Sequence, residues 1–138
     1  MSKHETPLTE QFWKEVCNGA YLPEFMLVSR TSNQARRLAD AVILTDRPHG
    51  RAQRSDYPNL NGENVVVVQT KAHRLGMNVM GQAVFSARLL KNLGANAVRS
   101  IILVTAEDAA MQNLLDDFPE VEVWIADPKL VEAPRRVH

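Results

Sequence analysis

The chain has 138 residues, of which 45% are hydrophobic and 23% charged, and its 16 basic and 16 acidic side chains cancel. This length predicts a single domain, 1–138, with one hydrophobic core. No stretch approaches the roughly 20 apolar residues that a membrane helix needs. The first residues lack the apolar segment of a signal peptide, and the only cysteine, Cys17, excludes an internal disulfide. We therefore expect a cytoplasmic protein with no membrane partner.

The charges are distributed unevenly along this neutral chain. Six arginines and two acids lie between Arg30 and Arg54, whereas six acids and no base lie between Glu107 and Glu122. A basic front half and an acidic back half predict an oriented field that could attract a polyanion. Two solvated faces of opposite sign, pairing across a homodimer, would explain the same distribution.

The first half of the chain predicts one helix followed by three strands. Thr9 is the expected N-cap of a short amphipathic helix, and Asn18-Gly19 is its expected end. Four consecutive valines, Val65–Val68, indicate a strand that is buried on both faces. The expected elements are a helix at 8–17, strands at 25–28, 40–46 and 65–71, a turn at 31–39 and a long loop at 47–64.

The second half alternates helices and strands. A helix is expected at 77–93, with Met77 and Met80 in the core and Gly94 just after its end. A strand at 101–104, a helix at 107–118, a strand at 121–125 and an exposed tail at 127–138 follow. This order predicts an α/β protein: a single three-layer domain with a central mixed β-sheet, an αβββαβ core at about 8–126, and a further helix and strand.

Polar residues at the ends of two neighbouring strands form the candidate site. If Asp46 lies opposite Asn64 in an antiparallel pair, Asp40 lies opposite Thr70, between Gln69 and Lys71. Asp40, Gln69 and the Thr70 carbonyl would be oxygen ligands for Mg²⁺, and Lys71 would stabilise charge on a phosphate. An ordinary salt bridge at the end of a sheet explains the same residues equally well.

Asp40 on one strand and Gln69-Thr70-Lys71 on the next, followed by a helix, resemble the restriction-endonuclease-like, PD-(D/E)xK, nuclease superfamily. The motif of that superfamily is an Asp, then an acid or Gln, one further residue and a Lys. The resemblance covers about residues 8–126, and the Mrr-like and RecB-like branches are nearest. It implies phosphodiester hydrolysis with Mg²⁺, or Mn²⁺ in its place, with Asp40 and Gln69 on the metal and Lys71 at the nucleophile.

The expected second helix carries a further part of this resemblance. Gln82 and Ser86 are similar to the Gln-xxx-Tyr motif of RecB-like nucleases, with serine in place of tyrosine, which implies a supporting role for Gln82. An acid near the first helix sometimes completes such sites, and Glu10, Glu15 and Glu24 all remain candidates.

Basic residues around this site indicate nucleic-acid binding. The expected contacts to a nucleic-acid backbone come from five residues: Arg47, Arg51, Arg54, His73 and Arg74. A solvated hairpin loop and a surface histidine would explain them as well.

These observations favour a homodimeric Mg²⁺-dependent nuclease that acts on DNA in preference to RNA. The first alternative is a catalytically inactive nuclease-fold subunit that binds nucleic acid or regulates a partner. The second is an unrelated α/β domain that binds a small anion at its strand ends, although no glycine-rich phosphate loop is present.

Overall fold

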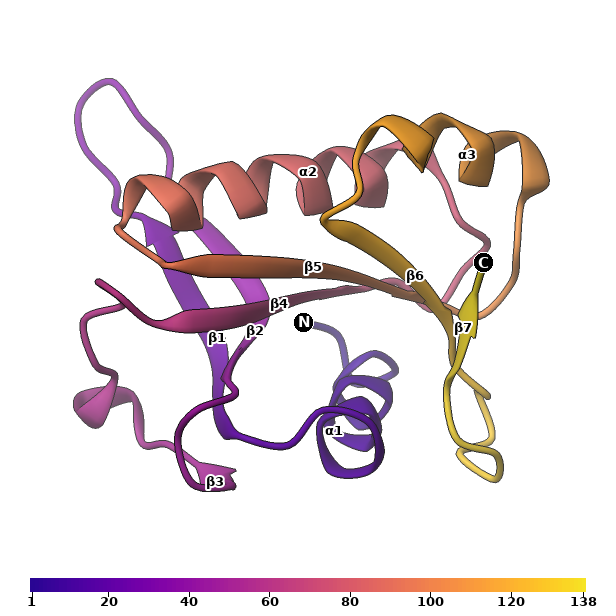
Figure 1. The fold of residues 1–138 in the computed structure, drawn as a ribbon, viewed down its shortest axis with the longest axis horizontal. Helices are drawn as coiled ribbons and strands as arrows, with labels where there is room; N and C mark the ends of the chain where they lie inside the picture. Colours follow the sequence, from indigo (N-terminus) through magenta and orange to yellow (C-terminus); the bar gives the residue numbers. More distant parts are fainter.

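A seven-stranded mixed β-sheet with helices on both faces forms the centre of the molecule (Figure 1). The computed structural model describes residues 1–138. Its helices are α1 (Thr6–Glu15), α2 (Met77–Asn92) and α3 (Ala109–Leu114), with short 3₁₀ turns at Arg54–Asp56 and Leu115–Asp117. Its strands are β1 (Ala20–Val28), β2 (Arg37–Leu44), β3 (Gly50–Arg51), β4 (Asn64–Thr70), β5 (Ala97–Val104), β6 (Val121–Ile125) and β7 (Arg135–Val137).

The strands lie in the order β3-β1-β2-β4-β5-β6-β7. The pairs β1–β2, β2–β4 and β6–β7 are antiparallel, whereas the pairs β4–β5, β5–β6 and β1–β3 are parallel. The parallel strands β4, β5 and β6 are joined through α2 and α3, as parallel pairing requires a crossover. Apart from the two-residue β3, the order α1-β1-β2-β4-α2-β5 is the αβββαβ order that was expected, and the three-layer α/β class is confirmed.

Two hydrophobic layers hold the sheet between the helices. α1 covers one face, and α2 and α3 lie on the other (Figure 1). The valines of β4 alternate between these layers: Val66 and Val68 pack with Phe12 of α1, whereas Val65 and Val67 pack with Leu90 of α2. The strand is therefore buried on both faces, as its run of β-branched residues predicted.

Several local expectations were wrong. Thr9 lies inside α1, which begins at Thr6 and has Pro7 in its first turn, where proline is tolerated. Met77 is 71% exposed, because it lies in the first turn of α2, outside the buried stripe that includes Met80. The tail is not entirely loose, since β7 pairs with β6 and completes the sheet.

Two further findings bear on these expectations. Cys17 is buried in the layer beneath α1, which agrees with a packing role. None of the helices is long and apolar enough to cross a bilayer.

Candidate functional site

The ends of β2 and β4 meet with a register that differs by one residue from the expected one. The pairs run from Leu44–Val65 to Ala41–Val68. Asp40 lies one position beyond the last of these pairs, opposite Gln69. The carboxylate of Asp40 nevertheless reaches the next residue, because its Oδ2 accepts a hydrogen bond of 2.7 Å from the backbone N–H of Thr70. Thr70 thus faces Asp40 with its own backbone N–H and not with its carbonyl.

Gln69 and Thr70 point to opposite faces of the sheet. The Nε2 of Gln69 donates to the Oγ of Ser86 on α2 at 2.8 Å, and Gln69 is only 4% exposed. The hydroxyl of Thr70 lies 2.7 Å from that of Thr9 on α1. The Gln69 side chain is thus held on the α2 face by Ser86 and makes no hydrogen bond to Asp40, whose carboxylate is bound by the Thr70 N–H, so these residues do not form one oxygen cluster. Ser86, which stands where the similar motif has tyrosine, instead holds Gln69.

A second carboxylate, that of Glu24, lies beside Asp40. Glu24 is opposite Asp40 in the β1–β2 ladder, between the pairs Pro23–Ala41 and Phe25–Ala39. Directly opposite residues of an antiparallel pair have neighbouring side chains. The backbone of Glu24 is in the left-handed region, with φ of 53°, which is uncommon for a residue other than glycine.

The other two candidate acids lie elsewhere. Glu10 forms an ion pair of 2.7 Å with Arg51, and Glu15 is exposed at the end of α1. Of the three acids left open by the sequence, Glu24 is therefore the one that neighbours Asp40.

Opposing effects set the electrostatics of this carboxylate pair. Burial raises the pKa of Asp40, and the charge of Glu24 raises it further. The N–H of Thr70, the ammonium group of Met1 and the charge of Lys71 act in the opposite direction without reversing the shift. Lys71 also lowers the pKa of Glu5, together with N–H groups at Ser2 and Ala72 that outweigh the effect of burial. Lys71 is thus close enough to Asp40 and to Glu5 to act on their charge.

The pair at Asp40 and Glu24 is suited to a hydrated cation. No three His, Cys, Asp or Glu side chains in the chain are grouped closely enough to hold a metal ion by themselves. However, Mg²⁺ keeps several waters and is commonly bound through one or two carboxylates. The two carboxylates already face a positive charge, because the Met1 ammonium donates to Glu24 Oε1 at 2.8 Å and its own pKa is raised by Glu24 and Asp40.

The hydroxyl of Tyr21 is also within range of the charges of Asp40 and Glu24. It is buried without a hydrogen-bond partner, and after burial itself the charges of Glu10, Asp40 and Glu24 contribute to raising its pKa. A buried hydroxyl without a partner is unfavourable. The side chains that could hold a cation here are Asp40 and Glu24, a different set from the expected Asp40, Gln69 and Thr70.

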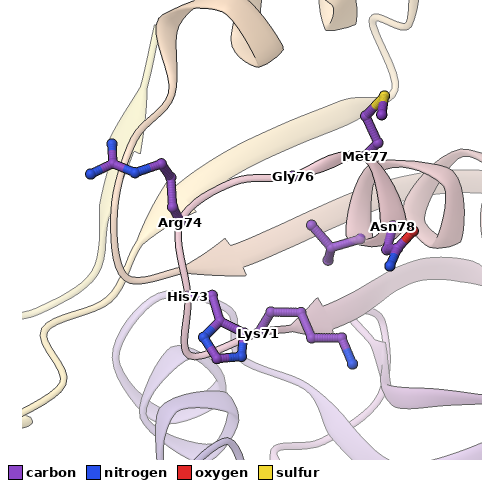
Figure 2. Close-up of a pocket in the computed structure, with 7 residues that line it drawn as sticks. Lys71, His73, Arg74, Gly76, Met77 and Asn78 are labelled. Atoms are coloured by element: carbon purple, nitrogen blue, oxygen red, sulfur yellow. The ribbon is translucent and has the colours of Figure 1, made fainter.

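Lys71 lines a pocket of about 540 Å³ together with His73, Arg74 and the first turn of α2. Figure 2 shows the Lys71 side chain running beneath this turn toward Asn78, whereas Arg74 extends away from it on the other side of the loop. Arg74 donates to the carbonyl of Glu107, which explains this orientation. The first turn of α2 has neither a side-chain cap nor an acidic residue, so that its N–H groups and the helix dipole add to the positive charge of Lys71.

The expected basic loop lies at the opposite end of the sheet. Arg47 follows the end of β2 that pairs with the beginning of β4, roughly 20 Å from Asp40 at the usual rise along a strand. It is paired with Glu63, and Arg51 is paired with Glu10. Arg54 has no carboxylate partner and is exposed.

Two arginines that were not singled out lie nearer to the site. Arg36 and Arg37, at the beginning of β2, line a second pocket with Gln69 and Gln82. The local abundance of arginine was visible in the sequence, but residues 31–39 were expected to form a turn, which gave no reason to place them beside the second helix.

Comparisons with protein-family models, with curated proteins and with solved structures found no match to this chain.

Proposed function

We propose that this protein hydrolyses phosphodiester bonds in nucleic acid with the help of a divalent cation, and that DNA is preferred to RNA. The observation that carries the proposal is the pair of carboxylates, Asp40 and Glu24, on adjacent strands with the charge of Lys71 in range. The order of helices and strands agrees with the nuclease superfamily that the motif resembles. A homodimer is part of the proposal, because the basic front half and the acidic back half of the chain could pair across two copies.

Each group has a distinct task in this proposal. Asp40 and Glu24 would hold the cation, and Mg²⁺ bound there would polarise a phosphoryl oxygen and lower the pKa of a bound water. Lys71 and the free N–H groups of α2 would bind the phosphate beside it, as the beginning of a helix commonly does for anions. The N–H of Thr70 fixes one oxygen of Asp40 and leaves the other oxygen for the cation.

A catalytically inactive nucleic-acid-binding subunit is the second candidate. It is favoured by the neutral Gln69, whose side chain is held by Ser86, and by the ion pair between the Met1 ammonium and Glu24. In that case the positive pocket at Lys71 would bind phosphate without cleaving it.

Cleavage of plasmid, linear duplex and single-stranded DNA, with and without Mg²⁺ or Mn²⁺, separates the two candidates. We expect Asp40→Asn, Glu24→Gln and Lys71→Ala each to reduce metal-dependent cleavage by at least about a hundredfold, since each removes a charge next to the reacting phosphate. Asp46→Asn is the matched control, because Asp46 is exposed at the far end of the sheet, where it accepts a hydrogen bond from Asn64.

The outcomes are distinct. Loss of cleavage in the three site variants but not in the control supports hydrolysis at this site. Binding of DNA without cleavage in either metal identifies the inactive subunit. Full cleavage by Lys71→Ala or Glu24→Gln would reject the assignment of the site.

A further inference from the structure

A groove on the α2 side of the sheet has a chemical character that hydrolysis at Asp40 does not use. It has a volume of about 440 Å³ and lies between α2 and the ends of β1 and β2 that form a hairpin. Figure 1 shows this hairpin rising beside α2. Leu27, Leu38 and Leu89 supply apolar walls, and the polar lining comes from arginine, glutamine and serine side chains without any acid.

The positive charge of this groove is not neutralised within the chain. Arg36 and Arg37 both line it and are exposed. The ion pairs of the protein involve five other arginines and the Met1 ammonium, so that neither Arg36 nor Arg37 has a carboxylate within 4.0 Å. Two adjacent guanidinium groups without a partner predict an anionic ligand, and phosphate suits their donor geometry.

An aromatic ring and a free amide complete the groove. Phe85 of α2 is 67% exposed, so that its ring is accessible to a ligand in the groove. Gln82 lies one helical turn before Phe85, is exposed, and makes no hydrogen bond in the structure. Aromatic rings in such positions stack on bases, and glutamine can form paired hydrogen bonds with a base edge.

We propose that this groove binds one unpaired nucleotide of a single-stranded nucleic acid. Its base stacks on Phe85 and is read by the amide of Gln82, while Arg36 and Arg37 hold the neighbouring phosphates. A base in a duplex has both faces covered by its neighbours, so that stacking on a protein ring favours a single strand. The inference deepens the proposed function and rests on it, because the bound nucleic acid is taken to run from this groove toward the phosphate that is hydrolysed.

The groove and the pocket at Lys71 are lined by neighbouring residues of β4 and α2. Gln69 lines the groove, and Lys71, two residues later, lines the phosphate pocket at the first turn of α2. A single strand that is held at Arg36 and Arg37 and passes Gln69 would lead toward Lys71. The ligand would therefore extend from the recognition groove to the reacting phosphate.

A second copy of the chain is the competing occupant of this surface. Phe85 also borders an apolar pocket between α2 and α3, formed with residues such as Val84, Leu114 and Phe118. The two unpaired arginines favour a polyanion over an apolar surface of another copy. Self-association is therefore an outcome that the experiment must be able to detect.

The experiment measures binding of a fluorescein-labelled single strand of about 12 nucleotides, within the site sizes of single-strand binders. Anisotropy is recorded in EDTA, so that no cleavage occurs, and a duplex of the same length is compared. The variants are Phe85→Ala, Gln82→Ala and the double variant Arg36→Ala/Arg37→Ala. Arg135→Ala controls for loss of an exposed arginine on the edge strand β7, and Leu114→Ala controls for loss of an exposed apolar side chain.

We expect the wild type to bind the single strand more tightly than the duplex. Phe85→Ala should weaken binding roughly tenfold to a hundredfold, in line with the loss of one stacked base. The double arginine variant should also reduce the slope of log affinity against log salt by about 1.4, the value for two phosphate contacts on a single strand. Both control variants should bind like the wild type, and circular dichroism should confirm that every variant is folded.

Three results would overturn the inference: tighter binding of the duplex, unchanged binding by Phe85→Ala, or an equal loss of binding in Arg135→Ala. The inference also fails if Phe85→Ala changes only the sedimentation coefficient, because a second copy then covers the ring. Selective loss of single-strand binding in a protein that never cleaves would uphold the groove and reject the proposed hydrolysis. Cleavage that is unaffected by the groove variants would uphold the proposed hydrolysis and reject the groove.

Discussion

Replacement of Gln69 by glutamate separates the metal site predicted from the motif from the one supported by the structure. If residue 69 is a metal ligand, Gln69→Glu adds a carboxylate to the cation and should increase cleavage. In the structure the side chain is 4% exposed on the α2 face, where its Nε2 donates to Ser86. We therefore expect the substitution to bury a carboxylate and to destabilise the protein without improving activity.

The size of the effect follows from this burial. Fully buried glutamates can have a pKa raised by about 3 to 5 units, and each unit corresponds to about 1.4 kcal/mol. The Ser86 hydroxyl can donate to the new carboxylate, and Arg36 and Arg37 line the adjoining groove, so that a shift of about 2 units is reasonable. The free energy of unfolding at pH 7 should then fall by about 3 kcal/mol, which lowers Tm by about 10 °C for a chain of this size.

The sign of the pH dependence is a further test. A carboxyl group with a raised pKa in the folded state is neutral in acid, so that the cost vanishes below about pH 4, the usual range of glutamate. The cost grows as the pH rises and is complete above the folded-state pKa. Gln69→Met is the control, because it loses the hydrogen bond, about 1 to 2 kcal/mol, without a charge and therefore without a pH dependence.

Thermal unfolding followed by circular dichroism between pH 4 and pH 8 measures these differences, and a cleavage assay at pH 7 accompanies it. Equal stability of Gln69→Glu and wild type at pH 7, with faster metal-dependent cleavage, would refute the reasoning. Residue 69 would then reach the cation, and the proposal that Glu24 is a metal ligand would be rejected.

Three further predictions concern the scaffold. Burial raises the pKa of Glu122, but hydrogen bonds from Arg99 at 2.7 and 2.9 Å and from a tryptophan lower it overall, so that this ion pair stabilises the fold above pH 4.5 and the stabilisation is lost in acid. Glu122→Gln should therefore lower the free energy of unfolding by about 1 to 2 kcal/mol at pH 7. Urea unfolding at several pH values should also show a smaller loss of stability in acid for this variant than for the wild type. A Cβ on Gly19 would lie 2.4 Å from a backbone oxygen of β2, and φ there is 147°, so Gly19→Ala should lose about 2 to 4 kcal/mol in urea unfolding, while Gly50→Ala, which meets nothing within 4 Å, should not. Burial raises the pKa of the Cys17 thiol, so iodoacetamide should label it only after unfolding, and rapid labelling of the folded protein would contradict its placement.

The local pattern of the chain was sufficient for the order and type of its main elements. Four valines in a row indicated a strand that is covered on both faces, and Val65–Val68 are buried on both. The apolar stripe of the second helix and the glycine after it predicted α2 to within a residue, and Gly94 has the positive φ that ends helices. These features depend on neighbouring residues, whose periodicity is written directly in the sequence.

The composition of the site was decided only by contacts between distant segments. Asp40 and Lys71 were recognisable, but the neighbour of Asp40 is Glu24, whose place depends on the β1–β2 register and on a backbone with positive φ. Gln69 turned toward Ser86, because alternate residues of a strand face opposite sides and its hydrogen-bond partner lies on a helix 17 residues away. A shift of one residue in register changes which side chains face each other, and no local pattern determines that shift. The type and order of the main strands and helices were therefore determined by the local sequence, whereas the set of groups that meet at their ends was determined by the packing of the whole sheet.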